Sequence, residues 1–563
     1  MSSGGVIVIG IDFGTTYSGV AWSLNGVSNE IEVISAWPCG GNKTTPKVPT
    51  TISFEEDNIR WGYETGQTDG IIRGVKLLLD ESKKVPYTPS IISNIILEKA
   101  GKTPVQVAGL FLKCLVAHTK AVLHRRFGEA FRGMELQYIL TVPAIWSDKA
   151  KNTTLTAGLS AGIAPSQVNL ISEPEAAAMH CLKAILPNTI QSQDVVIICD
   201  AGGGTVDLIS YHVISVHPLC LEEATQGTGG VCGSMMLDCA FEIMLINLLG
   251  HDRYHEIPKL SREAAMDCWR KNIKLNFGSE LFDENDEEGG SDCDERLGMD
   301  FFIPIPGVQD DPSIGLENGF LVIDGATVKG IFDPVVRQVD ALVNSQINDI
   351  VTAGMKAKAI LLVGGFGASE YLFRHLKRVH SPITVMQPQN AWSAVARGAV
   401  QSALDGNRVG KRIARCHYGI PTTVLYNALC HDRSEAFWDR REEEWKVNHR
   451  MSWHIRKGDP ILEDRPIKFP FYFTCDSTAG LVGSVYLRVC HMEEAPSKVT
   501  QDVFKLCSMQ YDLHAIPRES LKNSKGEEYY KVTFNVNMTP SSASLLFELE
   551  FNGLSYGAIS TKY

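Results

Sequence analysis

Two distant segments of the chain share one local pattern: an apolar strand that ends in aspartate, a turn of glycine and threonine, and a second strand that returns. The first copy is Ile7–Trp22, with Asp12 at the strand end, and the second is Val196–Tyr211, with Asp200 in the same place. Glycine lets backbone N–H groups converge on an anion, and threonine adds a hydroxyl donor. The pattern predicts a duplicated lobe rather than a solenoid, with two opposed hairpins that hold a polyphosphate between them.

The aspartate at each strand end indicates a cation between protein and phosphate. A carboxylate cannot face bare phosphate, whereas Mg²⁺ keeps most of its water, binds few carboxylates and bridges to phosphate. A third glycine turn, Gly364–Ser369, lies between the apolar strand Ile360–Val363 and a helix, where its backbone can approach a nucleoside. Other phosphate motifs are excluded, because Gly101–Thr103 lacks the first glycine of a P-loop and no G-x-G-x-x-G occurs.

The hydrophobic pattern divides the chain into two parts. Apolar runs alternate with helical stretches such as Val105–Phe127 and Pro334–Ala353 in the first part, which is typical of layered α/β folds. In the second part apolar residues alternate with period two, as in Lys531–Met538, which is typical of half-buried antiparallel strands. The expected boundaries are 1–405 for the α/β domain (lobe I about 1–190, lobe II about 191–380, return to lobe I about 381–405) and 415–563 for a β-rich domain.

Composition excludes several functional classes. The net charge of −12 provides no bulk attraction to nucleic acid or to an anionic membrane. We expect no transmembrane helix, because no apolar run reaches about 18 residues, and no signal peptide, because the N-terminus lacks a basic region. The 14 cysteines are scattered singly, which indicates reduced thiols rather than disulfides or zinc sites. We therefore expect a cytoplasmic protein, with nuclear residence left open.

Two charged segments interrupt these patterns. Asp283–Glu295 is acidic, but its spacing does not fit a calcium loop, so we expect a solvated insertion. In His431–Arg450, Trp438 and Trp445 lie seven residues apart. We interpret this segment as an exposed helix with a tryptophan stripe packed on the β-rich domain, and a docking motif is the alternative.

Five motifs resemble the actin/hexokinase/heat-shock ATPase superfamily. In chain order they are IGIDFGTTYSG, LTVPAIWSDKAK, LISEPEAAAMHC, ICDAGGGTVDLISY and ILLVGGFGASEYL. They are most similar to the heat shock protein 70 family, in particular to its divergent heat shock 70 kDa protein 12-like branch, strongly over residues 6–400 and weakly over 415–563. The resemblance implies an α/β, two-lobed actin-like ATPase with duplicated ribonuclease-H-like lobes, followed by a small β-rich substrate-binding domain without a helical lid.

The resemblance also implies roles for individual residues. Asp12 and Asp200 would hold the water shell of Mg²⁺, and Glu173, Asp207 and Asp12 would act in catalysis by orienting the metal and the attacking water. ATP or ADP would be held by the residues of three turns: Gly14, Thr15, Thr16 and Tyr17; Gly202, Gly203, Gly204 and Thr205; and Gly364, Gly365 and Gly367.

Departures from the family pattern bear on hydrolysis. Gly66 stands where the family has a lysine that reaches the γ-phosphate. Loss of that cation slows phosphoryl transfer by several powers of ten while leaving binding mostly intact. Arg73 and Lys76 are candidates to replace it, although helix packing or a surface position is the simpler interpretation of both. Ala368 takes the place of the adenine-stacking arginine.

Other departures bear on the base and on the partner. Lys271 and Lys274 are candidates for a second basic contact, which an amphipathic surface explains equally well. Pro143 and Lys151 match residues that pass nucleotide state to the substrate-binding domain. Leu404–Arg415, however, is basic where the family has a short apolar and acidic linker, so coupling stays open. The expected partners are protein clients bound by strand addition to the β-rich domain, and co-chaperones are compatible with the resemblance.

Three functions remain open at this point. The first is a slow ATPase that couples nucleotide state to the binding of a protein client or partner. The second is a nucleotide-sensing scaffold that does not hydrolyse ATP, which Gly66 and Ala368 motivate. The third is a small-molecule kinase of the same superfamily, which would need a catalytic aspartate beside a sugar pocket and would leave the β-rich domain unexplained. Enzymatic activity, if present, is expected to be slow Mg²⁺-dependent ATP hydrolysis.

Overall fold

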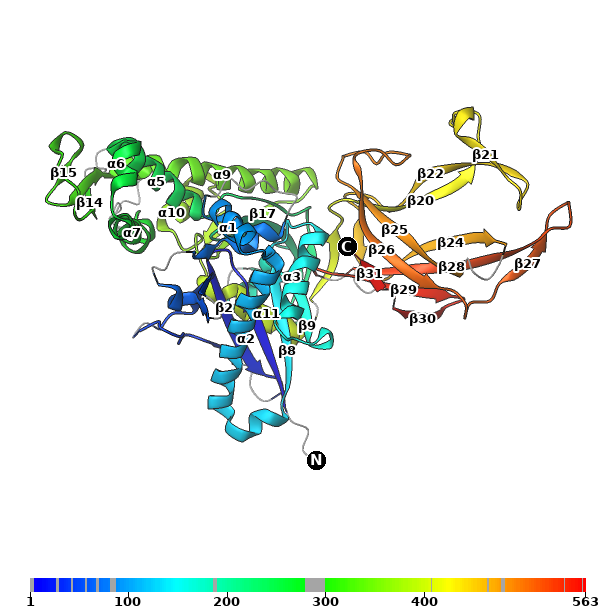
Figure 1. The fold of residues 1–563 in the computed structure, drawn as a ribbon, viewed down its shortest axis with the longest axis horizontal. Coiled ribbons are helices and arrows are strands. Elements are labelled where there is room, and N and C mark those ends of the chain that lie inside the picture. The colour runs from blue at the N-terminus through cyan, green and yellow to red at the C-terminus, as the bar shows by residue number, and fades with distance from the viewer. Residues whose placement is uncertain are drawn as a thin grey trace. The chain divides into compact units, whose positions relative to one another are not determined.

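The computed structural model describes residues 5–26, 30–41, 44–55, 58–66, 70–80, 88–185, 190–278, 299–406, 408–462, 465–476, 481–540, 542–558 and 560–562. The chain forms two compact units (Figure 1). The first contains Met1–Cys220 and Gly227–Arg408, and the second contains Leu221–Gln226 and Val409–Tyr563. This division differs from the expected boundaries in assigning Leu221–Gln226 to the second unit. The acidic segment Asp283–Glu295 lies outside the described residues, so its solvated insertion stays a prediction.

Lobe I of the first unit is a mixed sheet covered by helices. Its strands are β1 (Val6–Asp12), β2 (Tyr17–Leu24), β3 (Glu32–Val33), β4 (Lys47–Pro49), β8 (Glu135–Val142) and β9 (Val168–Ser172), with a small second sheet of β5 (Thr51–Glu55), β6 (Asn58–Trp61) and β7 (Ile72–Arg73). Its helices are α1 (Thr88–Lys99), α2 (Pro104–Phe127), α3 (Asp148–Ser160), α4 (Glu173–Ile185) and the returning α11 (Ala394–Asp405).

Lobe II has a sheet of the same kind. The strands of this sheet that lie wholly in the first unit are β10 (Val195–Ala201), β11 (Val206–Val216), β13 (Thr228–Gly230), β17 (Ala357–Val363) and β18 (Thr384–Met386), and a separate small sheet holds β14 (Asp300–Pro304), β15 (Leu316–Glu317) and β16 (Phe320–Asp324). Its helices are α5 (Met235–Leu249), α6 (His251–Glu256), α7 (Lys259–Cys268), α8 (Lys274–Asn276), α9 (Gly325–Thr352) and α10 (Glu370–Val379). Strand β12 (Leu219–Glu223) then leads into the segment that belongs to the second unit.

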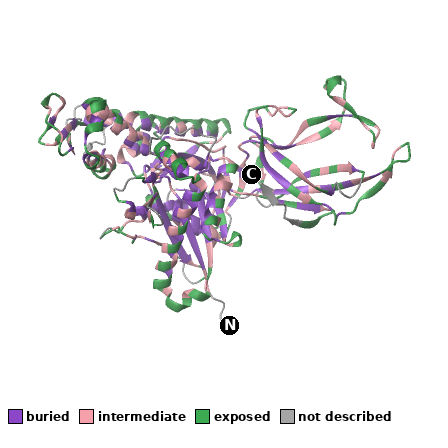
Figure 2. Ribbon diagram, viewed as in Figure 1, coloured by how far each residue is buried: buried purple, intermediate pink, exposed green. Residues whose placement is uncertain are grey.

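The two sheets repeat one topology, which confirms the duplicated lobe. In lobe I, β1 pairs antiparallel with β2 and parallel with β8, and β8 is parallel to β9. In lobe II, β10 pairs antiparallel with β11 and parallel with β17, and β17 is parallel to β18. Figure 2 shows that buried residues concentrate in these sheets. Each central strand is covered on both faces, which explains why its sequence is apolar without alternation.

The long helices begin where the local sequence can cap them. Thr103 precedes α2 and accepts a hydrogen bond from Gln106 N at 3.3 Å, while the Gln106 side chain accepts one from Thr103 N at 2.9 Å, which is a capping box. Asp324 caps α9 in the same way by accepting from Thr327 N at 2.8 Å. The helix therefore starts well before the predicted Pro334. Among the described residues, Pro104–Gly133 is long and apolar enough to cross a membrane by length and composition, and 44% of its most apolar window is buried in the fold.

Two glycines let the returning helix α11 enter lobe I. A Cβ on Gly398 would lie 1.6 Å from the carbonyl oxygen of Ala176 in α4, and a Cβ on Gly10 would lie 2.4 Å from the carbonyl oxygen of Ala396. Both neighbours are backbone atoms, so no side-chain rotation can relieve the contact. Helix α11 therefore packs between β1 and α4 only because these two positions lack side chains.

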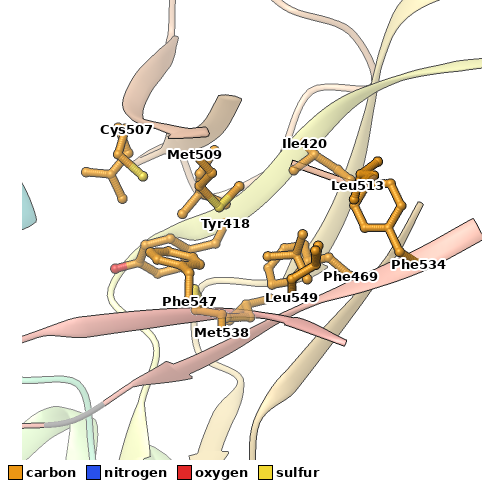
Figure 3. Packing of buried hydrophobic residues seen from close by; sticks show 14 of the residues in the cluster. Tyr418, Ile420, Phe469, Cys507, Met509, Leu513, Phe534, Met538, Phe547 and Leu549 are labelled. Atoms are coloured by element: carbon orange, nitrogen blue, oxygen red, sulfur yellow. The ribbon is translucent and has the colours of Figure 1, made fainter. Parts of the chain in front are cut away.

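The second unit is a two-sheet β structure, which confirms the expected β-rich part. One sheet contains β20 (His417–Leu425), β21 (Ala436–Asp439), β22 (Glu444–Ile455), β25 (Val482–Cys490), β26 (Val503–Asp512) and β31 (Ser560–Lys562), and the other contains β24 (Ile467–Cys475), β27 (Glu519–Lys522), β28 (Glu528–Pro540), β29 (Leu545–Phe551) and β30 (Leu554–Ala558). Two further strands, β19 (Val409–Ile413) and β23 (Pro460–Leu462), pair with each other. Figure 3 shows side chains from both sheets meeting in one apolar core, including Ile420, Met509, Phe534 and Leu549.

The predicted helix in His431–Arg450 is wrong. The structure has a hairpin of β21 and β22 in which Trp438 and Trp445 are cross-strand partners, with ring centroids 5.7 Å apart. A spacing of seven residues suits one face of a helix, but a short turn between two strands brings the same residues opposite each other. Arg433 stacks on Trp445, with its guanidinium carbon 3.8 Å from a ring centroid.

We predict that Gly398→Ala destabilises the first unit by about 2 kcal/mol or more, because the new methyl group overlaps the backbone of α4. The matched control is Gly330→Ala in α9, where a Cβ meets nothing within 4 Å. That substitution should be neutral or stabilising by up to about 1 kcal/mol, since alanine is the better helix former. Scanning calorimetry of the full chain checks both. Equal unfolding midpoints for the two variants would contradict the close crossing of α11 and α4.

Candidate functional site

The two turns of glycine and threonine, one between β1 and β2 and one between β10 and β11, face each other at close range. A Cβ on Gly203 would lie 2.1 Å from Thr16 Oγ1, and a Cβ on Gly204 would lie 2.6 Å from Thr15 Oγ1. The β1–β2 turn and the β10–β11 turn are therefore in contact across the two lobes, as the opposed-hairpin prediction requires. Only glycine fits at these two positions, because a side chain would overlap the threonine hydroxyls.

The start of α5 holds the second turn in place. The turn is closed by a hydrogen bond from Gly202 N to Thr205 O at 2.9 Å. The carbonyl oxygens of Gly202, Gly203 and Gly204 accept hydrogen bonds of 2.9–3.2 Å from the backbone N–H groups of residues 233–235. The turn's carbonyl oxygens are thus bound by protein, which fixes the orientation of its peptide groups.

The third glycine turn packs directly on the second. The N–H groups of Phe366 and Gly367 both donate to Ala201 O, at 2.8 and 3.0 Å. A Cβ on Gly364, whose φ is +87°, would lie 2.5 Å from Asp200 Oδ1. The structure therefore brings all three sequence-predicted turns to one place, at the carboxyl ends of β1, β10 and β17.

Four carboxylates gather beside these turns. Asp12 ends β1, Glu173 begins α4 directly after β9, and Asp200 is the cross-strand partner of Asp207 in the β10–β11 hairpin. All four residues are at most 8% exposed. Asp207 Oδ1 accepts a hydrogen bond from the Ile145 N–H at 3.1 Å. The sequence predicted each of these acids separately, and the fold brings them into one cluster.

Burial makes this cluster electrostatically unfavourable without added positive charge. It raises the pKa of Asp200 well above its usual value, and the charges of Glu173, Asp12 and Asp207 raise it further. Burial also raises the pKa of Glu173 to about 7, although the ammonium group of Lys76 opposes the shift. A site of this kind favours a cation, because a cation stabilises the ionised form of each acid.

Two buried lysines supply part of the missing positive charge. Lys76 Nζ lies 2.5 Å from Glu173 Oε1, and its side chain is 2% exposed. Lys47 Nζ lies 2.8 Å from Asp12 Oδ2. Our simpler interpretation of Lys76, as a packing or surface residue, is therefore wrong. Lys47 was missed altogether, because a lone lysine in a short strand carries no signal in the sequence.

The structure also describes Gly66 and the other candidate cations, Arg73, Lys271 and Lys274. Gly66 ends a short 3-10 helix and has open space within 4 Å of its Cβ position. Arg73 belongs to β7, where its backbone bonds to the Ser93 hydroxyl of α1 at 2.8 Å. Lys274 donates to Asp238 Oδ1 at 2.8 Å in a mostly buried pair, and exposed Lys271 pairs with Asp267 at 2.5 Å. Both lysines near α8 are thus bound to acids of lobe II.

The acidic cluster fits a hydrated metal better than a directly ligated one. Among the residues that the structure describes, no group of three or more His, Cys, Asp or Glu side chains is arranged to hold a metal ion directly. Magnesium does not require such a group, since it keeps several waters and takes one or two carboxylates together with substrate phosphate. Asp12 and Asp200, at the ends of equivalent strands, are the residues that would face its water shell.

Comparison with known proteins finds similarity to heat shock 70 proteins. A family model described as "Hsp70 protein" matches residues 8–216, and a second, "Domain of unknown function (DUF8568)", matches residues 412–556. The chain is 23% identical over 508 residues to heat shock 70 kDa protein 12A of Mus musculus and of Homo sapiens, which covers 75% of this chain and 73% of those proteins. It is 24% identical over 312 residues to human heat shock 70 kDa protein 12B, covering 44% of this chain and 45% of that protein.

We predict that Asp200→Asn stabilises the nucleotide-free protein at pH 8 by about 1–2 kcal/mol, because it removes one charge from a buried acidic cluster. The gain should shrink at pH 5.5. The raised pKa of Asp200 means that the folded state binds a proton on this carboxyl group more tightly than the unfolded state does. The ionised carboxylate therefore lowers the stability of the fold only as pH rises. Thermal unfolding at both pH values checks this.

The matched control is Asp310→Asn, which removes an exposed carboxylate and should change stability little at either pH. Equal destabilisation by Asp200→Asn at both pH values would contradict the like-charge cluster.

Proposed function

Because the chain is a divergent member of the heat shock protein 70 family, in its 12-like branch, we propose that it is a slow Mg²⁺-dependent ATPase that couples its nucleotide state to the binding of a protein partner. The actin-like first unit carries the nucleotide site, and the β-rich second unit carries the partner site. ATP and ADP are the cofactors, and a cytoplasmic location is part of the proposal. The described cysteines are all free thiols, which supports a reducing compartment.

One observation carries the proposal of hydrolysis: the buried ammonium group of Lys76 in the acidic cluster. Its Nζ also lies 5.9 Å from the ring centroid of Phe13 and 5.5 Å from that of Trp146, so packing fixes it beside the β1–β2 turn. We propose that Lys76 supplies the cation that Gly66 cannot provide, from a different element of the same lobe. A fixed positive charge at this place would stabilise the charge that develops on the transferring phosphoryl group.

The remaining residues act by position. The threonine hydroxyls and glycine N–H groups of the two opposed turns would bind the phosphate oxygens. When bound, Mg²⁺ would neutralise phosphate charge from the water shell that Asp12 and Asp200 face. Glu173 and Asp207 would orient the attacking water, and a Glu173 pKa near neutrality suits it to accept a proton at physiological pH.

The scaffold remains the second candidate because of the same ion pair. Lys76 is bound to Glu173 at 2.5 Å, so it must exchange this partner for phosphate before it can assist transfer. If the pair persists when nucleotide binds, the protein senses ATP without hydrolysing it. No observation on the described residues favours a small-molecule kinase.

We predict that Lys76→Met lowers the rate of phosphate release by about 10²–10³-fold while the dissociation constant for Mg-ATP changes less than about fivefold. The physical reason is that the ammonium group acts mainly on charge that appears in the transition state. Single-turnover phosphate release together with calorimetric titration checks this. Lys113→Met, which removes an exposed lysine of α2, is the matched control and should change neither quantity.

The two candidates separate in the same experiment. A wild-type rate no faster than that of Lys76→Met, with ATP bound by both proteins, would favour the scaffold. Loss of ATP binding in Lys76→Met would mean that Lys76 holds the ground state rather than the transition state.

The chain runs directly from a phosphate turn into the second unit, which supports coupling between nucleotide and partner. Strand β11 starts directly after the Gly202–Thr205 turn, and β12 follows it along the chain. Glu222 and Glu223, at the end of β12, pair with basic residues of Leu404–Arg415: Lys411 Nζ lies 2.5 Å from Glu222 Oε2, and Arg412 Nη1 lies 3.9 Å from Glu223 Oε1. Glu223 Oε2 also accepts a hydrogen bond from Ile413 N at 2.8 Å. The positive charge of Leu404–Arg415, which left coupling open, is thus partly compensated inside the second unit, and the chain itself joins that unit through β12 to β11 and its phosphate turn.

We predict that the affinity for a permanently unfolded polypeptide, reduced and alkylated, differs about fivefold or more between the ATP-bound and ADP-bound protein. Glu223→Ala should reduce that difference and leave ATP affinity unchanged, because it removes the buried partner of β19. Glu222→Ala, which removes a more exposed ion pair, is the control with the smaller effect. Fluorescence anisotropy of the labelled polypeptide measures each affinity. Identical affinities in both nucleotide states of the wild type would contradict coupling.

A further inference from the structure

A tryptophan that the sequence motifs do not include lies between two of the glycine turns. Trp392 belongs to a short 3-10 helix, Ala391–Ser393, directly before α11, and its side chain is 37% exposed. The carbonyl oxygen of Ala391 accepts a hydrogen bond from Gly364 N at 3.3 Å, which ties this short helix to the third turn. A half-exposed indole at this position has an apolar face available to a ligand.

The indole contacts elements from both sides of the nucleotide site. A Cβ on Gly365 would lie 3.6 Å from Trp392 Nε1, so the polar edge of the ring rests on a residue without a side chain. On the other side, the ring of Tyr17, the first residue of β2, meets the indole edge to face, with centroids 6.2 Å apart at 79°. Tyr17 is itself 40% exposed. The two rings form a partly open aromatic pair that joins the phosphate end of the site to the third turn.

A nucleotide whose phosphates lie between the opposed turns must extend its nucleoside away from them. The third turn packs on the β10–β11 turn, so it borders that direction, and its exposed Ala368 presents only a methyl group. Base recognition by hydrogen bonds selects one base, whereas stacking on an aromatic ring tolerates any base, because every base has a π-face.

We propose that Trp392, with Tyr17 beside it, is the surface on which the nucleoside of a bound purine nucleotide packs, and that this site discriminates weakly between bases. The inference rests on the proposed nucleotide-binding function and deepens it. Phosphate affinity then comes from the glycine and threonine turns, and the additional affinity of a nucleotide over a bare polyphosphate comes from the indole. GTP should bind nearly as well as ATP.

The test compares three ligands on the full chain: Mg-ADP, Mg-GDP and magnesium tripolyphosphate, each titrated by calorimetry. For the wild type we expect ADP and GDP affinities within about threefold of each other. Trp392→Ala should weaken both nucleotides about tenfold or more and leave tripolyphosphate binding unchanged, because it removes only the nucleoside contact. Trp392→Phe should keep most of the affinity, since it retains an aromatic face.

Trp438→Ala is the matched control, because it removes an indole that is 51% exposed in the second unit and should alter none of the affinities. Nucleotide binding by Trp392→Ala that equals or exceeds that of the wild type would overturn the inference alone. Parallel loss of tripolyphosphate binding in Trp392→Ala and Trp392→Phe would also overturn it, because the effect would not be specific to the nucleoside. Wild-type protein that binds none of the three ligands would refute the proposed function as well.

Discussion

The site depends on the mutual repulsion of four buried carboxylates and on the cations or protons that offset this repulsion. Strand register and helix position force Asp12, Asp200, Asp207 and Glu173 together in a region from which water is largely excluded. Isolated buried charges of one sign are strongly unfavourable, so such a cluster persists only with cations or with protons. The protein provides two ammonium groups, and the site still favours a further cation. The proposed binding of a nucleotide with magnesium therefore rests on how the two lobes are assembled.

The features that could be predicted from the sequence are those encoded locally. Each hairpin turn, its terminal aspartate and the alternation in β28 follow from the residues of one segment, and the structure contains them. The ion pair of Lys76 with Glu173 could not be predicted, because it joins a 3-10 helix to a helix start that lies 97 residues away. The hairpin that holds Trp438 and Trp445 was missed for the opposite reason, since a spacing of seven fits two kinds of local structure.

The proposed relocation of a cation to Lys76 also changes how departures from a family pattern should be interpreted. Gly66 by itself suggests loss of hydrolysis, but a charge needs only to reach the right place, and several elements border this site. Lys76 reaches it from a neighbouring element of lobe I. In the same way, aromatic surface beside Gly365 comes from the chain before α11 and not from the turn itself. Function is then carried by the geometry of the site rather than by one motif position.

The most direct test of this account is a calorimetric titration of the wild-type protein with Mg-ATP, followed by an assay of phosphate release in the same sample. The account predicts micromolar binding that requires magnesium, and slow but measurable release. Binding that is equally strong without magnesium would contradict the role of the acidic cluster. Absence of binding would contradict the central claim, because the three glycine turns would then be only architectural.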